Sequence, residues 1–173
     1  IVEVNVGMNR CGTEPGEDTT ALARVITDSP GLRFDGVMGY EGHTVAVRDE
    51  SERRANAELA MNTLLSAVDS IEAAGMPVNV ISASGTGTYN ITGTMDRITD
   101  LQCGSYIFMD GDYLEVFQDF KPALTVLATV ISRPTSDRAV LDTGMKAMSI
   151  DRGLPIVVDV PGAQYTSISE EHG

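Results

Sequence analysis

With 173 residues, of which 42% are hydrophobic, the chain can bury a sizeable core in one domain, or in one domain and part of another. A formal net charge of -13 and a pI near 4.3 argue against nucleic acid or an anionic membrane surface as partner, because both would repel the protein. No apolar run approaches the ~20 residues of a membrane helix, and Cys11 and Cys103 lie far apart in the sequence, so we expect a cytoplasmic protein with free thiols.

The first part of the chain alternates β-type and amphipathic segments. We predict strands at residues 1–7, 32–40, 78–81 and 106–109, and helices at 16–28 and 49–74. Asp49 should cap the longer helix, with Glu52 three residues later, and Gly75 should end it. This order is typical of parallel βα units, and four such units are half of a (β/α)8 barrel.

After about residue 120 the pattern changes to short β-type runs separated by glycine and proline. These runs cover residues 124–132, 139–142, 156–160 and 164–168. We therefore predict an α/β fold, the second half of a (β/α)8 barrel over residues 1–118, followed by the start of a β-domain over residues 119–173. Since the first residues already read as a core strand, we expect an internal piece of a longer protein.

Two glycine-containing loops lie beside predicted strands: one follows the strand at 78–81, and the other precedes the strand at 106–109. The first loop reads Ser84, Gly85, Thr86, Gly87, Thr88, and the second contains Gly104 and Ser105. Bare backbone N–H groups and small hydroxyls at neighbouring strand ends are suited to holding a phosphate. Either loop alone could equally be a simple turn, but two of them at roughly twenty positions apart favour an anion site.

Five short motifs, taken in chain order, resemble one enzyme family. They are Val6-Gly7-Met8-Asn9-Arg10-Cys11-Gly12, Gly39-Tyr40-Glu41-Gly42-His43, Ser84-Gly85-Thr86-Gly87-Thr88, Gln102-Cys103-Gly104-Ser105-Tyr106-Ile107-Phe108-Met109-Asp110 and Asp142-Thr143-Gly144-Met145-Lys146. Together they resemble the D-threonine aldolase and D-serine dehydratase-like enzymes, which have an alanine-racemase-type barrel. The resemblance spans nearly the whole chain and implies an enzyme of fold type III that uses pyridoxal 5'-phosphate at the mouth of the barrel.

The resemblance implies a role for several residues of this chain. The phosphate cup matches Ser84, Gly85, Thr86, Gly87, Gly104 and Ser105, in agreement with the chemistry of the loops. Arg10 matches a catalytic arginine beside the phenolic oxygen of the cofactor, and Tyr40 matches a catalytic residue close to its pyridine ring. Without the resemblance, Arg10 could equally be a surface arginine and Tyr40 a core tyrosine. Gln102 takes the cofactor-binding position where alanine racemases carry an arginine facing the pyridine nitrogen.

Other groups that such an enzyme needs are expected outside this chain. The two lysines, Lys121 and Lys146, lie at or beyond the change to β-type runs, whereas the resemblance places the Schiff-base lysine on the first barrel strand and makes Lys146 structural. It also places a pair of divalent-metal ligands after His172, so we expect no metal ligand here. His43 has two interpretations, an active-site residue or a loop histidine bonded to backbone, and we favour the second slightly.

We interpret the chain as a fragment of a pyridoxal-phosphate-dependent, metal-activated lyase acting on a small D-3-hydroxy amino acid. Retro-aldol cleavage, as in D-threonine aldolase, and elimination of ammonia, as in D-serine or 3-hydroxyaspartate dehydratases, both stay open. Gln102 argues against a racemase, and the β-type runs after residue 122 argue against a non-catalytic cofactor-binding barrel. A glycine-rich domain without cofactor is the remaining alternative. The fragment alone should be inactive, and a homodimer is one assembly we consider for the full-length protein.

Overall fold

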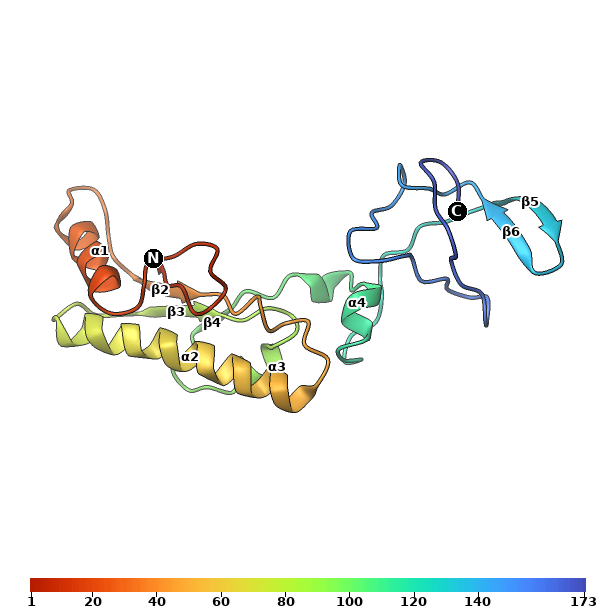
Figure 1. The fold of residues 1–173 in the computed structure, drawn as a ribbon. Coiled ribbons are helices and arrows are strands. Elements are labelled where there is room, and N and C mark those ends of the chain that lie inside the picture. The colour runs from red at the N-terminus through yellow and green to blue at the C-terminus, as the bar shows by residue number, and fades with distance from the viewer.

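The computed structural model describes all 173 residues and contains an α/β part and a β-rich part, arranged along one elongated molecule (Figure 1). The α/β part is built on a sheet of four strands, β1 (Val2–Glu3), β2 (Gly36–Gly39), β3 (Val80–Ala83) and β4 (Asp100–Leu101). All neighbouring strands are parallel, and their order in the sheet is their order in the chain. A parallel sheet wound in one direction is the arrangement of a (β/α)8 barrel, whereas a doubly wound sheet reverses its strand order. The predicted half-barrel is therefore confirmed.

Two long helices cover the sheet. They are α1 (Glu17–Asp28) and α2 (Glu50–Ala73), each within a residue of its predicted bounds. The carboxylate of Asp49 accepts the backbone N–H of Glu52 at 2.8 Å, so the predicted N-cap is present. Gly75 follows the helix with a φ of +80°, the left-handed conformation that favours glycine at a helix end.

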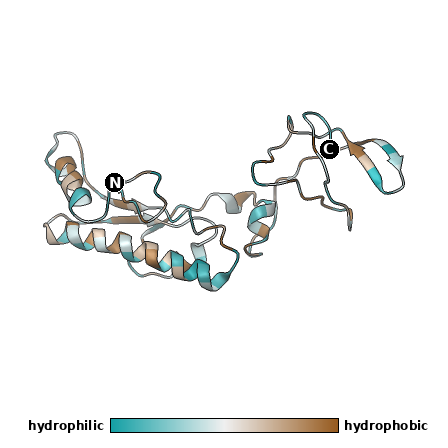
Figure 2. Cartoon of the chain, in the orientation of Figure 1, coloured by the Kyte–Doolittle hydropathy of each residue, from teal (hydrophilic) through white to brown (hydrophobic).

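The hydrophobic core lies between these helices and the strands. A single cluster of 15 buried residues joins the first three strands to both helices, and α2 contributes Ala60, Met61, Leu64, Ala67, Val68 and Ile71. The apolar positions of α2 recur along its length between polar ones (Figure 2). Gly39 lets this helix approach the sheet, because a Cβ there would lie 2.7 Å from the side chain of Val6 and 3.0 Å from that of Leu64.

The predicted strand at residues 106–109 is wrong. The fourth strand is β4, which comes earlier, and the 3-10 helix η1 (Ser105–Ile107) follows it. The N–H groups of Phe108 and Met109 both donate to the carbonyl oxygen of Ser105, a local pattern that a strand does not make. A φ of 55° at Met109 also turns the chain, so local turn bonds override the β propensity of the aromatic run.

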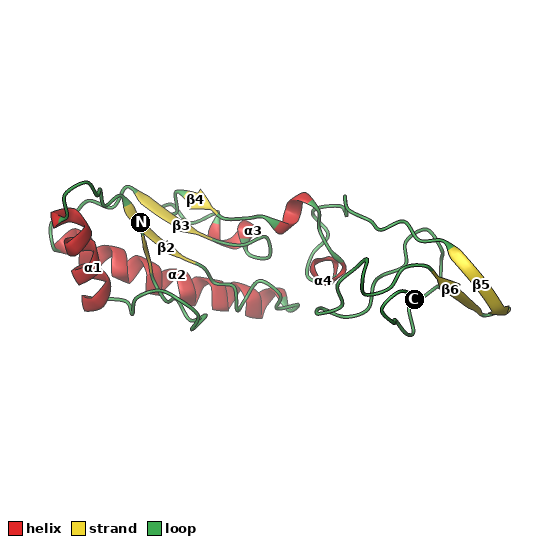
Figure 3. Ribbon diagram, turned by 90° about the horizontal axis from the view of Figure 1, so that it is seen from above, coloured by secondary structure: helices red, strands yellow, loops and turns green.

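Several other predicted strands are shorter or missing. The predicted strands at 1–7 and 32–40 shrink to β1 and β2, and a short helix α3 (Tyr89–Thr92) precedes β4. After α4 (Gly111–Leu114), the β-rich part contains one antiparallel hairpin, β5 (Val130–Thr135) and β6 (Arg138–Leu141) (Figure 3). The runs at 156–160 and 164–168 form no strand.

The β-rich part has almost no core of its own. Of residues 119–173, Thr143 and Gly144 alone are buried, and the apolar side chains of Leu127, Ile156 and Val158 are exposed. A two-stranded hairpin is at best marginally stable by itself in water, so the short strands there reflect a shortage of packing partners. No helix is both long and apolar enough to cross a membrane. Cys11 and Cys103 are free, as expected.

The core position of α2 gives a test of its packing with a matched control on the same helix. Leu64 is fully buried, whereas the side chain of Leu59 is 68% exposed. We expect Leu64→Ala to lower the free energy of unfolding by about 2–5 kcal/mol, and Leu59→Ala to change it by less than about 0.5 kcal/mol. Urea unfolding of the two purified variants measures both values. Equal losses would contradict the placement of the α2 stripe.

Candidate functional site

The two predicted glycine loops lie next to one another at the carboxyl ends of β3 and β4. The backbone N–H of Tyr106 donates to the hydroxyl of Thr86 at 3.1 Å, and the Ser84 hydroxyl lies 3.9 Å from the sulfur of Cys103. Parallel strands bring their carboxyl ends to one edge of a sheet, which explains why loops about twenty residues apart in sequence meet. The structure thus brings the two predicted halves of the anion site together.

Four backbone N–H groups in these loops have no acceptor within the chain. They belong to Thr86, Gly87, Gly104 and Ser105. By contrast, Gly85 donates to the Thr88 hydroxyl at 3.2 Å, and Thr88 donates to the carbonyl oxygen of Gly85 at 3.1 Å. Free N–H groups on adjacent loops are the type of donor that suits an anion such as phosphate.

The Gly104 position is open. A Cβ at Gly104 would meet no atom within 4 Å, whereas a Cβ at Gly87 would collide with the carbonyl oxygen of Val45. Gly104 therefore leaves room for a ligand, and Gly87 lets the segment after β2 pack closely on the loop. This donor set and this space fit the phosphate of pyridoxal 5'-phosphate.

Tyr40 lies beside the first glycine loop and Arg10 lies over its ring. A Cβ on Gly85 would be 2.9 Å from the Tyr40 ring, so the ring packs directly on the loop backbone. The guanidinium carbon of Arg10 is 5.8 Å from the ring centroid, within the range of a cation–π contact. Burial raises the pKa of the Tyr40 hydroxyl and the Glu41 carboxylate raises it further, while Arg10 opposes both. Tyr40 is therefore a hydrogen-bond donor at neutral pH.

Gln102 continues the line of β4 toward the same edge. Its backbone N–H donates to the carbonyl oxygen of Ala83, and its side-chain amide donates to the hydroxyl of Ser82 at 2.8 Å. The side chain is exposed, and its amide oxygen accepts no hydrogen bond. A neutral amide with a free acceptor thus stands at the position of the expected cofactor contact.

The remaining predicted residues lie apart from the glycine loops or make other contacts. His43 is exposed against Gly7 and makes no hydrogen bond, so the bond to backbone that we favoured is absent. Lys146 pairs with Glu171 at 2.7 Å on the surface of the β-rich part, as a structural position would. Lys121 is exposed.

Our sequence analysis missed Glu41 as a member of the site. This residue is fully buried directly after Tyr40. One carboxylate oxygen accepts the hydroxyls of Thr88 at 2.7 Å and Thr92 at 2.8 Å, and the other accepts the N–H of Ser84 at 3.1 Å. A glutamate in a polar loop is normally exposed, and its three partners lie 43 to 51 positions away, so no local pattern pointed to it.

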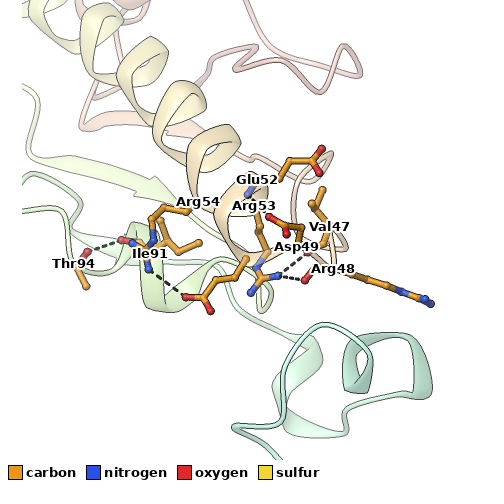
Figure 4. A network of polar contacts seen from close by, with 9 residues as sticks. Val47, Arg48, Asp49, Glu52, Arg53, Arg54, Ile91 and Thr94 are labelled. Atoms are coloured by element: carbon orange, nitrogen blue, oxygen red, sulfur yellow. Dashed lines mark hydrogen bonds and ion pairs between the residues drawn. The ribbon is translucent and has the colours of Figure 1, made fainter.

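The segment from Glu41 to the start of α2 is fastened at its far end by Arg53. This arginine is buried on the first turn of α2 and donates to the carbonyl oxygens of Val47 at 2.6 Å and Arg48 at 3.3 Å (Figure 4). The segment carries Val45, whose carbonyl oxygen lies against Gly87. Buried hydrogen bonds at Glu41 and partly buried ones at Arg53 therefore hold this segment against the first glycine loop.

An apolar hollow adjoins the site on the side of the second loop. It is lined by Thr86, Tyr89, Leu101, Cys103, Tyr106 and Phe120. Burial raises the pKa of the Cys103 thiol, and the hydrogen bond with Ser84 opposes that rise. The thiol is therefore neutral at physiological pH and behaves as a small apolar group.

Comparisons with known proteins agree with this arrangement. Residues 1–112 match the family described as alanine racemase, N-terminal domain, and residues 123–173 match the serine dehydratase domain. The chain is 37% identical to the D-threonine aldolase of Arthrobacter sp over 177 residues. It is 34% identical to the 3-hydroxy-D-aspartate aldolase of Paracoccus denitrificans (strain Pd 1222) over 182 residues. Both matches cover 100% of this chain and 47% of the relative, so the chain spans about half the length of the curated relatives it matches.

Two solved structures are similar along almost the whole chain. The crystal structure of D-threonine aldolase from Filomicrobium marinum superposes with a TM-score of 0.95 at 37% identity, over 99% of this chain and 48% of that one. D-threo-3-hydroxyaspartate dehydratase from Delftia sp. HT23 superposes with a TM-score of 0.79 at 26% identity, over 99% of this chain and 50% of that one. Each superposition covers both parts of the chain, so the half-barrel and the β-rich part occur together in both of these structures.

The contrast between Gly87 and Gly104 gives a prediction about stability. We expect Gly87→Ala to lower the free energy of unfolding by about 1–3 kcal/mol, because the new methyl group must displace the Val45 backbone. Gly104→Ala should change it by less than about 0.5 kcal/mol, because its Cβ enters open space at a φ of -123°. Thermal unfolding of the ligand-free variants measures the difference. Similar losses for both would show that the loop is not clamped as described.

Proposed function

Because the chain belongs to the alanine racemase N-terminal domain family, we propose that it is the central part of a longer lyase that binds pyridoxal 5'-phosphate and acts on D-3-hydroxy amino acids. The observation that carries the proposal is the meeting of two glycine loops with four free N–H groups beside Tyr40 and Arg10. The sparse core of residues 119–173 supports the longer polypeptide, because their exposed apolar side chains need packing partners.

In this proposal the residues of the chain hold and orient the cofactor. The N–H groups of Thr86, Gly87, Gly104 and Ser105 bind the phosphate, with Ser84 and Gly85 shaping the loop. When bound, pyridoxal 5'-phosphate supplies an electron sink for bond cleavage at the α-carbon. Arg10 would supply a positive charge for the cofactor's phenolic oxygen. Tyr40 would serve the pyridine ring as a protonated donor, and Gln102 would offer a neutral amide to the ring nitrogen.

Retro-aldol cleavage is the first candidate reaction and dehydration the second. Identity to the two aldolases is 37% and 34%, and the more similar of the two structures is also an aldolase. The dehydratase from Delftia supports the alternative, since it shares the fold at 26% identity. Gln102 argues against a racemase, because a neutral amide cannot repel a proton from the pyridine nitrogen as an arginine does. The lysine that holds the cofactor and the ligands of a divalent metal lie outside this chain in the proposal.

Three further points belong to the same proposal. The boundary between the half-barrel and the β-domain lies at residues 118 and 119. The two free cysteines suit a cytoplasmic location. A homodimer is the assembly to test first for the full-length protein.

A single substrate can separate the candidate reactions. We expect the full-length protein, supplied with pyridoxal 5'-phosphate and Mn²⁺, to convert D-threo-3-hydroxyaspartate into glycine and glyoxylate in equal amounts. A dehydratase would instead release ammonia and oxaloacetate, and a racemase would form the epimer at the α-carbon. Chromatography of the products distinguishes these outcomes, with L-threonine as a control for stereochemistry. Absence of all three products, on this substrate and on D-threonine, would refute the proposed lyase.

The phosphate assignment predicts a charge-dependent loss of cofactor at Ser105. This residue is exposed and its side chain contacts only the hydroxyl of Tyr113, so substitution should leave the fold intact. We expect Ser105→Asp to weaken cofactor affinity at least about tenfold, because a like charge then faces the phosphate at short range. Ser105→Asn introduces a side chain of the size of aspartate without its charge, so it should weaken cofactor affinity much less. Fluorescence titration of the apo-protein measures both, and equal affinities would place the phosphate elsewhere.

A further inference from the structure

Glu41 is a buried carboxylate without a cationic partner. Its side chain is fully buried, and none of the ion pairs of the chain includes it. Three neutral donors, the N–H of Ser84 and the hydroxyls of Thr88 and Thr92, satisfy it. Burying a charge this way costs free energy that an apolar side chain would avoid, so its retention calls for a role that depends on these bonds.

The bonds of Glu41 determine which donors of the glycine loop stay free. The Thr88 hydroxyl has one proton, and it points to the carboxylate at 2.7 Å. Its oxygen is therefore available to accept the N–H of Gly85 at 3.2 Å. The N–H groups of Ser84 and Gly85 are thus both hydrogen-bonded, whereas the next two, of Thr86 and Gly87, have no acceptor.

Glu41 also stabilises an unfavourable backbone conformation at the entrance of the loop. Ser84 has a φ of 75°, in the left-handed region that residues with a Cβ rarely adopt. The carboxylate accepts the N–H of this residue, and such charge-assisted bonds are stronger than neutral ones. The reversal at Ser84 turns the following residues toward the second loop, where the Thr86 hydroxyl accepts the N–H of Tyr106.

We propose that Glu41 is a positioning residue for the cofactor phosphate: through Ser84 and Thr88 its carboxylate holds the loop so that the N–H groups of Thr86 and Gly87 face the anion. This inference rests on the proposed function, because it names the phosphate of pyridoxal 5'-phosphate as the ligand. The hydroxyl of Thr92 bonds the same carboxylate from α3, whereas Thr92 contacts the loop only through its backbone N–H, which donates to the carbonyl oxygen of Thr88 and is kept in Thr92→Val. It therefore offers a matched comparison.

The test compares Thr88→Val with Thr92→Val in the full-length protein. Each change removes one buried hydroxyl bonded to the same carboxylate oxygen and keeps the side-chain volume, and Thr88→Val also leaves the N–H of Gly85 without its acceptor, so both should lower the melting temperature of the apo-protein, Thr88→Val by more. We expect Thr88→Val to weaken binding of pyridoxal 5'-phosphate about tenfold and Thr92→Val by no more than about twofold. The ³¹P chemical shift of the bound phosphate should move in the first variant only.

A double mutant checks that the effect runs through the carboxylate. Glu41→Gln keeps the size of the side chain but replaces one acceptor oxygen by a donor, so it should weaken binding at least as much as Thr88→Val. Adding Thr88→Val to Glu41→Gln should then cause little further loss, because the two residues act in series. If Glu41→Gln does not fold, the two threonine variants decide alone.

The outcomes separate this inference from the proposed function. Wild-type protein that binds pyridoxal 5'-phosphate, with equal losses in the two threonine variants, would overturn the positioning role and leave the proposed function standing. An unchanged ³¹P shift in Thr88→Val would do the same. Wild-type protein that binds no pyridoxal 5'-phosphate would overturn the proposed function, and the inference with it.

Discussion

The parallel pairing of β2 with β3 is the constraint on which the site depends. It aligns Gly36 with Val80 and Gly39 with Ala83, so the residues after both strands leave the sheet side by side. A side chain at Gly36 would collide with the carbonyl oxygen of Val80, so this register needs glycine. Because the register is fixed, Glu41 comes within hydrogen-bond reach of Ser84.

The long helices of the fold were predictable from the sequence, and the short strands and turns were not. Helix α2 was predicted to within one residue at each end, because its apolar spacing, its Asp49 cap and Gly75 all point to the same element. The strand predicted at 106–109 was wrong. High β propensity means that a residue suits a half-buried sheet surface, and these residues instead form local turn bonds to Ser105. The strand predictions were least accurate in the β-rich part, because strand pairing there depends on neighbours distant in sequence.

The same reasoning explains which parts of the site could be found. The two loops with free N–H groups were predictable, because such groups need only glycine and small residues at a strand end, and both are visible locally. Glu41 was not, because its burial follows from the pairing of β2 and β3 and from the placement of Thr88 and Thr92 on a third segment. A buried carboxylate is identified by its donors, and these are brought together by the tertiary fold alone.

The chain carries a net charge of -13, and yet its proposed ligand is an anion. Surface charges more than about 8–10 Å away are largely screened at physiological salt, so the nearby dipoles and charges determine binding. Glu41 is near and buried, so screening removes little of its repulsion. The five residues from Ser84 to Thr88 resolve this conflict by dividing their donors. Those at the two ends of the loop point to the carboxylate, which disperses its charge, and the two N–H groups in the middle stay free for the ligand. One loop therefore contacts the carboxylate of Glu41 and carries the free N–H groups, and in the proposed site the carboxylate that repels the ligand also orders the donors.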